Sequence, residues 1–234
     1  MTALLAAVAV ALGAVAQFAT GFGFSLVSAP FLIAAYRAPT GVQLNLVLSV
    51  VVNLALLARE HRGIDFRAAG SLLLPAMVAT VPVGYAVRHS HPEPLTVLAG
   101  AICLAGVVAL ASGRQFRRVS SKAGTVVVGA VSGGMNATAS ISGPPVVLFA
   151  VNAGWPLNRA RPTMQVFFLG LNTVTLAALG WPDHLPVGVV TAFVAGVLAG
   201  ALLAGRLPET VVRPATLALA GVGSVLAIFR GVTG

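Results

Sequence analysis

Two stretches of small and polar residues interrupt long apolar segments, and they are the part of the sequence best suited to bind a ligand. The first reads Thr20-Gly-Phe-Gly-Phe-Ser25 and the second reads Ser140-Ile-Ser-Gly-Pro-Pro145. Glycines permit tight turns, and a serine before glycine and proline is typical of a helix N-terminus. Such an end aims unpaired N–H groups and about half a positive charge at its surroundings. Two facing helix ends predict a site for a small oxyanion.

The candidate ligands of that anion are uncharged residues at the two interruptions and in the segments that follow them. They are Thr20, Gly21, Gly23, Ser25, Asn136, Thr138, Ser140, Ser142, Gly143, Gln43, Asn45, Gln165 and Asn172. Because helix ends would supply the positive potential, this site needs no buried Lys or Arg. Phe22 and Phe24 are expected to be apolar packing or plugs, with a gate as the alternative. Asn53 and Asn172 can equally be contacts between helices.

Ionisable side chains are absent from the middle of the apolar segments, and this excludes several other kinds of chemistry. All acidic and histidine residues fall in expected loops or segment ends: Glu60, Asp65, Glu93, Asp183, Glu209, His61, His89, His91 and His184. A dedicated proton relay is therefore disfavoured. The sequence has no HExxH or Walker-type motif and a single cysteine, Cys103. We predict no enzyme activity, no metal site and no cofactor.

The composition predicts that these residues are positioned by helices in a membrane. Of 234 residues, 58% are hydrophobic and 8% are charged, whereas soluble domains are about 25% charged. The net charge of +9 has a simple cause in a membrane protein, because cytoplasmic loops collect Lys and Arg. The fold class expected is an all-α polytopic membrane protein. The lipid bilayer is its expected partner, and no nucleic-acid partner is expected.

Charged and proline-rich breaks divide the chain into eight apolar segments. They span residues 3–36, 43–58, 68–87, 94–112, 123–153, 163–181, 186–205 and 212–229. Six of them have about the length of one transmembrane helix. The segments 3–36 and 123–153 are longer and interrupted midway, which predicts helical hairpins with limbs of about 15 residues that reach only partway through the bilayer.

The same order of features recurs in the second half of the chain. Gly13-Ala-Val recurs as Gly129-Ala-Val, and Pro92-Glu93 recurs as Pro208-Glu209, at an offset of 116 residues, and Pro30 recurs as Pro145 at an offset of 115. We interpret residues 1–118 and 119–234 as two repeats. Each repeat is expected to be a re-entrant or broken helical hairpin followed by three transmembrane helices.

The distribution of basic residues favours hairpins that enter and leave on one face. One face then holds eleven basic residues: Arg59, Arg62, Arg67, Arg114, Arg117, Arg118, Lys122, Arg159, Arg161, Arg206 and Arg213. The other face holds Arg37, Arg88 and Arg230. Cytoplasmic loops carry the excess of positive charge, so both termini are predicted to be non-cytoplasmic. The two repeats then have opposite orientations, as in many secondary transporters.

The interrupted stretches also carry a family resemblance. Residues 19–30, with Thr20-Gly-Phe-Gly-Phe-Ser25, together with Ser132-Gly-Gly and Ser142-Gly-Pro-Pro145, resemble the paired motifs of the sulfite exporter TauE/SafE family, also called the 4-toluene sulfonate uptake permease family. The resemblance covers essentially the whole chain. It implies a permease of the bacterial inner membrane for sulfite or an organosulfonate such as sulfoacetate.

The sequence therefore predicts a multi-pass permease that moves a small sulfur-containing anion by alternating access, with export as the expected direction. The alternatives are a non-transporting membrane scaffold subunit and a passive anion channel. Inverted repeats with broken helices favour the carrier. The sequence leaves open whether the protein forms a homodimer.

Overall fold

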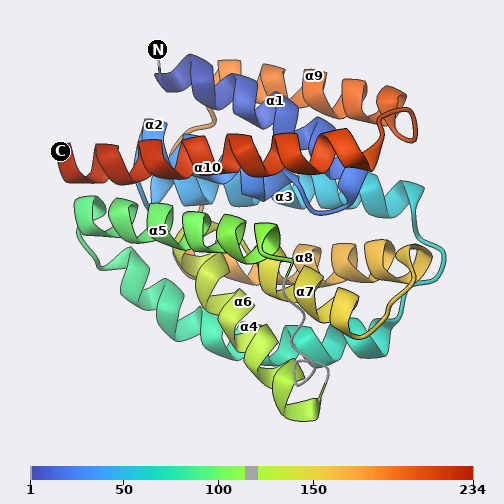
Figure 1. The fold of residues 1–234 in the computed structure, drawn as a ribbon. Coiled ribbons are helices and arrows are strands. Elements are labelled where there is room, and N and C mark those ends of the chain that lie inside the picture. Colours follow the sequence, from blue (N-terminus) through green and yellow to red (C-terminus); the bar gives the residue numbers. More distant parts are fainter. Residues whose placement is uncertain (1, 114–120, 234) are drawn as a thin grey trace.

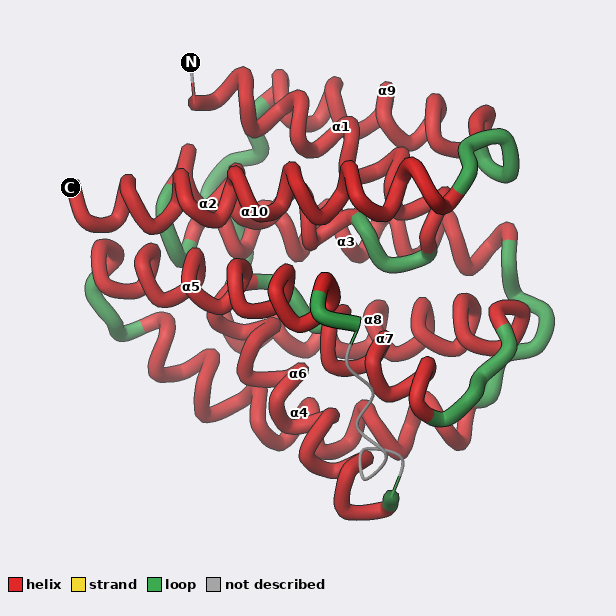
Figure 2. Tube along the Cα trace, viewed as in Figure 1, coloured by secondary structure: helices red, strands yellow, loops and turns green. Residues whose placement is uncertain are grey.

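The computed structural model describes residues 2–113 and 121–233, which form ten helices and no strand (Figures 1 and 2). The first five are α1 (Thr2–Thr20), α2 (Phe24–Tyr36), α3 (Thr40–Arg59), α4 (Phe66–Arg88) and α5 (Pro92–Ala111). The others are α6 (Lys122–Ala139), α7 (Gly143–Asn152), α8 (Leu157–Leu179), α9 (Val187–Leu203) and α10 (Glu209–Thr233). Arg114, Arg117 and Arg118 lie outside the described residues.

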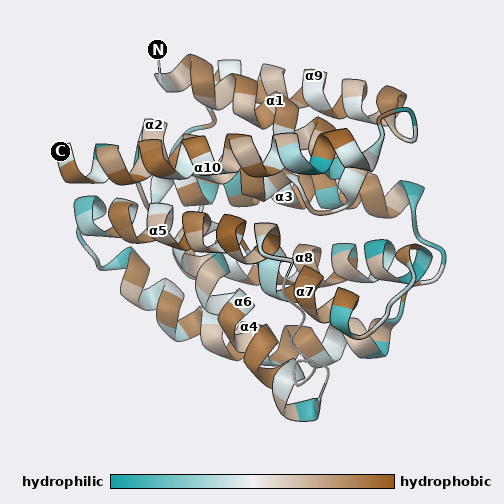
Figure 3. Cartoon of the chain, viewed as in Figure 1, coloured by the Kyte–Doolittle hydropathy of each residue, from teal (hydrophilic) through white to brown (hydrophobic). Residues whose placement is uncertain are grey.

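The helices have the lengths and outer surfaces of a membrane protein. Six of them, α1, α3, α4, α5, α8 and α10, are long and apolar enough to cross a bilayer. Large apolar side chains such as Leu74, Val78, Leu98 and Leu202 are more than half exposed, and Figure 3 shows hydrophobic residues along the outward faces of the helices. In water such surfaces would be unstable, whereas lipid accepts them. The predicted all-helical membrane class is confirmed.

Each interrupted segment forms two helices of unequal length. The first limbs, α1 and α6, have 19 and 18 residues, whereas the second limbs, α2 and α7, have 13 and 10. At about 1.5 Å per residue, α1 nearly matches the ~30 Å core of a bilayer. The prediction that both limbs reach only partway is therefore wrong for α1, because its apolar run continues to the break without a helix-breaking residue.

The loops gather at two opposite ends of the molecule (Figure 1). The terminal end holds both termini and the α2–α3, α4–α5 and α8–α9 loops; Arg230 Nη2 there donates to Thr2 Oγ1 at 3.1 Å. The basic end holds the α3–α4, α7–α8 and α9–α10 loops, and the ion pair between Arg159 and Asp65 at 2.6 Å joins two of its segments. The described basic residues at this end are Arg59, Arg62, Arg67, Lys122, Arg159, Arg161, Arg206 and Arg213.

The two halves interlock through their first helices. Helix α1 packs against α9 of the second half, and α6 packs against α4 of the first half. Glycines permit both approaches: a Cβ on Gly196 would lie 2.5 Å from the carbonyl oxygen of Ala11, and one on Gly133 would overlap that of Ala76. Small residues bring helix backbones close together in membranes. The central contact of the molecule is between α3 and α8.

Helix α8 begins six residues before the predicted segment 163–181, at Leu157. The prediction placed Arg159 and Arg161 in a loop because they are charged and Pro162 follows. Both charges have partners at the basic end, Arg159 with Asp65 and Arg161 with Glu60. Pro162 lies inside α8, where it removes one backbone hydrogen bond and its ring crowds the carbonyl group four positions earlier. The other single-crossing segments begin and end within four residues of the prediction.

Candidate anion-binding site

The two breaks at residues 21–23 and 140–142 are each held by an amide side chain from the other half. At the first break, Gln165 of α8 donates from Nε2 to the carbonyl oxygen of Gly21 at 2.6 Å. At the second break, Asn45 of α3 donates from Nδ2 to Ser140 Oγ at 2.9 Å. The third helix of each half, α3 or α8, thus holds the break of the other half. Gln165, Gly21, Asn45 and Ser140 were all predicted site residues.

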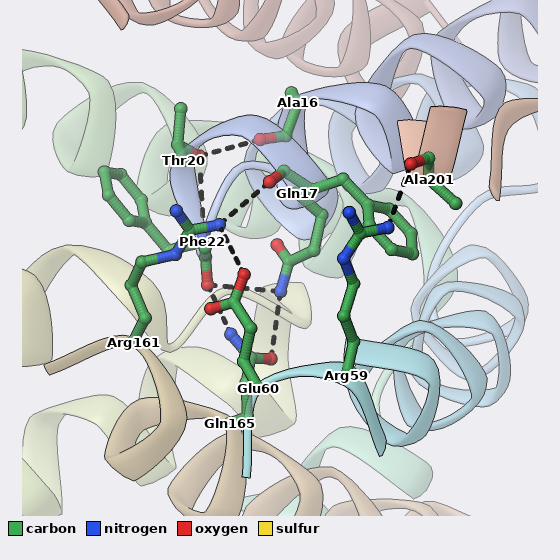
Figure 4. A network of polar contacts seen from close by, with 11 residues as sticks. Ala16, Gln17, Thr20, Phe22, Arg59, Glu60, Arg161, Gln165 and Ala201 are labelled. Atoms are coloured by element: carbon green, nitrogen blue, oxygen red, sulfur yellow. Dashed lines mark hydrogen bonds and ion pairs between the residues drawn. The ribbon is translucent and has the colours of Figure 1, made fainter. Parts of the chain in front are cut away.

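Gln17 organises the first break from inside the hairpin (Figure 4). Its Nε2 lies 3.3 Å from the carbonyl oxygen of Gly21, 3.2 Å from Gln165 Oε1 and 3.2 Å from Asn53 Oδ1. Its Oε1 accepts the N–H of Phe24 at 2.9 Å. The first N–H of α2 is therefore occupied by Gln17, and the free donors of that helix end are the following N–H groups, Ser25 and Leu26.

The second break is formed by Ser140 in the left-handed region, with φ of 55°. A non-glycine residue seldom adopts this conformation, and the Asn45 hydrogen bond supports it. Helix α7 then begins at Gly143 with Ser142 as its N-cap residue, although the Ser142 side chain makes no capping hydrogen bond. Because Pro144 and Pro145 have no N–H, this helix end offers fewer donors than its position suggested.

A small polar cavity lies where the two breaks meet. Its volume is about 20 Å³, which is room for about one water molecule. Four predicted residues line it: Ser25, Ser142, Gly143 and Asn172. The remaining lining residues are Gln17, Phe22, Phe24, Ser49, Asn53 and Phe168. In this structure the tips are closed around the cavity.

Asn45 connects the wall of this cavity to both breaks. Its Nδ2 also donates to Ser25 Oγ at 3.1 Å, and its Oδ1 accepts from Ser28 Oγ. Ser25 and Ser49 hydroxyls lie 3.0 Å apart. The hydroxyl groups facing the cavity are therefore oriented by a buried amide, which fixes the position of the donors that a ligand would meet.

The other predicted residues lie outside the cavity. Asn136 donates to Asn172 Oδ1 at 3.0 Å and to Thr175 Oγ1 at 2.8 Å. Its own Oδ1 is buried without a hydrogen-bond donor among the described residues. Asn136 thus acts through Asn172, which does line the cavity. Thr138 bonds back to the carbonyl oxygen of Gly134 in its own helix.

Three further predicted residues have roles in packing and helix ends. Thr20 Oγ1 donates to the carbonyl oxygen of Ala16 and faces a wider cavity toward the basic end. Gly23 lies against Ala16, where a Cβ would come within 2.8 Å. Gln43 donates to the carbonyl oxygen of Leu179 at 3.0 Å, at the terminal end.

Arg161 lies beside the first break, although it is not among the residues that line the cavity between the tips. Its Nη2 donates to the carbonyl oxygen of Phe18 at 2.8 Å and pairs with Glu60 Oε1 at 3.2 Å (Figure 4). Its side chain crosses Gly21, where a Cβ would lie 3.2 Å from Arg161 Cγ. Because Gly21 also has φ of +88°, glycine is required here for two reasons.

The membrane-spanning lengths of the helices agree with a comparison with known families. Residues 5–227 match the family model described as Sulfite exporter TauE/SafE. The chain belongs to the TauE/SafE family. Its members are membrane transporters of sulfur anions rather than enzymes. Comparisons with curated proteins and with solved structures give no significant match.

In this TauE/SafE protein, sequence reasoning left Gln17, Ser49 and Arg161 out of the predicted site and took Asn53 as either a ligand or a contact between helices. Gln17 and Asn53 were visible as polar residues in apolar segments, and Ser49 lies four residues from both Asn45 and Asn53. That spacing places the three α3 residues on one helix face. Arg161 likewise lies four residues before Gln165. A search for polar residues at helical spacing could have found both stripes.

Proposed function

We propose that this TauE/SafE protein moves a small sulfur oxyanion, sulfite or an organosulfonate such as sulfoacetate, across the bacterial inner membrane by alternating access and in the direction of export. The observation that carries the proposal is the polar cavity between two helix breaks, each held by an amide from the opposite half. Broken helices that meet near the middle of two repeats are typical of substrate sites in secondary transporters.

The cavity lining suits an oxyanion chemically. Hydroxyl groups of Ser25, Ser49 and Ser142 and the amides of Asn53 and Asn172 are hydrogen-bond donors. No acidic side chain is among the lining residues, so nothing there repels a negative charge. The helix ends at α2 and α7 add positive potential. An anion leaving water would thus exchange its hydration for several oriented donors.

Alternating access requires the closed tips to separate on one side at a time. The bonds from Gln165 to Gly21 and from Asn45 to Ser140 join the two halves, so loosening one of them frees one tip and leaves the other held. The reciprocal packing of α1 on α9 and of α6 on α4 supports the interpretation of residues 1–118 and 119–234 as inverted repeats.

The orientation that we propose puts the basic end in the cytoplasm, because positively charged loops are retained there. Both termini would lie on the opposite, periplasmic side. An inside-negative potential then favours outward movement of the anion by about 2.3 kcal/mol per charge for each 100 mV. The predicted direction is therefore export, without a dedicated proton relay.

The decisive experiment is flux of labelled sulfite and sulfoacetate into liposomes that contain the purified protein. We expect saturable flux. We expect Ser142→Ala and Asn172→Ala to raise the half-saturation constant several-fold, because each variant loses one hydrogen-bond donor to the anion. Ser71→Ala is the matched control, since Ser71 is exposed on α4 and bonds only to Ala68 of its own helix. Absence of flux for every sulfur oxyanion tested contradicts the proposal.

A further inference from the structure

A second and larger cavity lies between the tips and the basic end. Its volume is about 140 Å³, against about 20 Å³ for the cavity between the tips. It occupies the space beside the short helix α7, and its lining includes Val147 and Ala150 of that helix, Leu110 at the end of α5 and Leu217 of α10. We call this cavity the vestibule.

The vestibule shares lining residues with two other cavities. Toward the surface it shares Leu157 and Arg161 with an open bowl that is also lined by Arg59 and Arg62. Toward the interior it shares Phe22 with the polar cavity between the tips. An anion arriving at the basic end would therefore pass Arg161 before it reaches Phe22, which stands between the two cavities.

Two arginines on different helices line the vestibule, Arg161 of α8 and Arg213 of α10. Arg161 uses only Nη2 for its protein acceptors, Phe18 and Glu60, while its Nε is buried and has no acceptor among the described residues. Arg213 makes one long hydrogen bond, 3.5 Å to the carbonyl oxygen of Leu110. Buried donors nearly always have partners, so the unpaired Nε indicates a place where an acceptor belongs.

Most of the remaining wall is apolar or aromatic, and its polar residues are Thr20 and Thr216. Trp155, Met164 and Leu217 line it together with Phe22. Two guanidinium groups facing an apolar wall match a ligand that has a charged oxyanion head and a short hydrocarbon body. A bare inorganic anion would leave that wall unfilled.

We propose that the vestibule is a second anion-binding site, in which Arg161 and Arg213 hold the head of a short-chain sulfonate and the apolar wall holds its body. This inference rests on the proposed function, because the vestibule is the step that precedes the site between the tips. The charge-assisted bonds to the two arginines supply affinity, and Phe22 separates the two sites.

The position of Trp155 provides a local reporter. The sequence has two tryptophans, and the other, Trp181, is 66% exposed after the end of α8. In a full-length Trp181→Phe protein, we expect propane-1-sulfonate to change Trp155 fluorescence in a saturable way. We expect 1-propanol, which has the same body without the charge, to cause no such change. Sulfite should bind at least several-fold more weakly, and equal affinity would overturn the role of the apolar wall.

The arginine variants test the head group. Arg213→Gln should raise the Kd for propane-1-sulfonate about tenfold or more, as expected for loss of a charge-assisted bond. Arg161→Gln should do the same, but Arg161 also holds the first break, so Arg213→Gln is the decisive variant. Arg206→Gln is the control, because Arg206 is in the α9–α10 loop at the same end and its side chain donates to the carbonyl oxygen of Leu202 at the end of α9. Equal Kd values for Arg213→Gln and Arg206→Gln would overturn the proposal.

Failure of this inference and failure of the proposed function give different results. If flux is present but no sulfonate changes Trp155 fluorescence, the vestibule site is refuted and the transport function stands. If flux is absent but the titration saturates and depends on Arg213, the transport function is refuted and the vestibule site stands. Ser142→Ala, which alters the site between the tips, should leave the Trp155 titration unchanged.

Discussion

Uncharged amides do most of the positioning in this protein, because an amide both donates and accepts hydrogen bonds. Gln17 donates toward Gly21 and accepts from Phe24, so one side chain satisfies both sides of a helix break. A carboxylate in its place could only accept and would bring a negative charge to the path of an anion. The sequence showed which residues are polar and uncharged, but the partner of each depends on which helices pack together.

At the residue scale, Gln165→Leu should abolish transport. It removes the shorter of the two hydrogen bonds to the Gly21 carbonyl oxygen and one of the three acceptors of Gln17 Nε2. Leaving buried polar groups unpaired costs about 1–3 kcal/mol. Thermal unfolding in detergent and liposome flux should both detect the change.

The matched control is Gln43→Leu, which changes an amide that bonds to the Leu179 carbonyl oxygen at the terminal end. This variant should keep most of its flux. Loss of flux in Gln43→Leu equal to that in Gln165→Leu would contradict the assignment of the first break to the site.

Gly21→Ala should destabilise the protein by about 1–2 kcal/mol or more, because alanine disfavours a positive φ and its methyl group would press on Arg161. Gly134→Ala is the comparison: Gly134 is in the body of α6 and a Cβ there would meet nothing within 4 Å. Helix propensity even favours alanine at that position. Similar melting temperatures for the two variants would show that Gly21 is unconstrained.

At the scale of elements, the existence and order of the helices could be predicted, whereas their starts depended on tertiary contacts. The apolar lengths and the interruptions at residues 21–23 and 140–142 were sufficient to place the breaks. The early start of α8 was not visible, because only the folded protein brings Asp65 and Glu60 to its arginines. As a result, the positive charge of Arg161 beside the first break was missed as well.

At the start of α4, one carboxylate is both the N-cap of the helix and a partner in an ion pair. The stability of this helix start therefore depends on pH. Asp65 accepts the N–H of Ala68 at 2.8 Å and pairs with Arg159. The Ala68 N–H, followed by Arg159, lowers the pKa of the Asp65 carboxyl below its usual 3.8. Because the folded pKa is lowered, the stabilisation is complete above that usual value and is lost as the pH falls through the lowered pKa.

We expect Asp65→Ala to lower stability at neutral pH, because α4 loses its N-cap side chain. The melting curves of the variant and the parent protein should converge as the pH is lowered toward about 3. Asp183→Ala removes an exposed carboxylate in the α8–α9 loop and should change little. A difference that stays constant over the whole pH range would contradict the role of the ionised cap.

At the scale of the whole molecule, the proposed topology places both ends of each hairpin on one face of the membrane. The distribution of basic residues between the two faces depends on this arrangement. The single cysteine, Cys103, is fully buried, so the parent protein should be silent to a membrane-impermeant maleimide. We expect Thr2→Cys and Arg37→Cys to be labelled from outside intact spheroplasts. Arg62→Cys, at the basic end, should be labelled only after lysis.

The labelling pattern has one outcome that would refute this topology. If Thr2→Cys and Arg37→Cys react from opposite sides, residues 2–36 cross the membrane as a whole and the two halves do not have opposite orientations. The sequence could predict the pairing of these positions from the distribution of Lys and Arg. It could not predict that α1 packs on α9 of the other half, because close packing of small residues leaves little trace in composition.

Gln165 of the second half holds the first break, and Asn45 of the first half holds the second break. Each half is therefore incomplete by itself. A fragment with only one half would have a helix break that lacks the amide side chain of the other half.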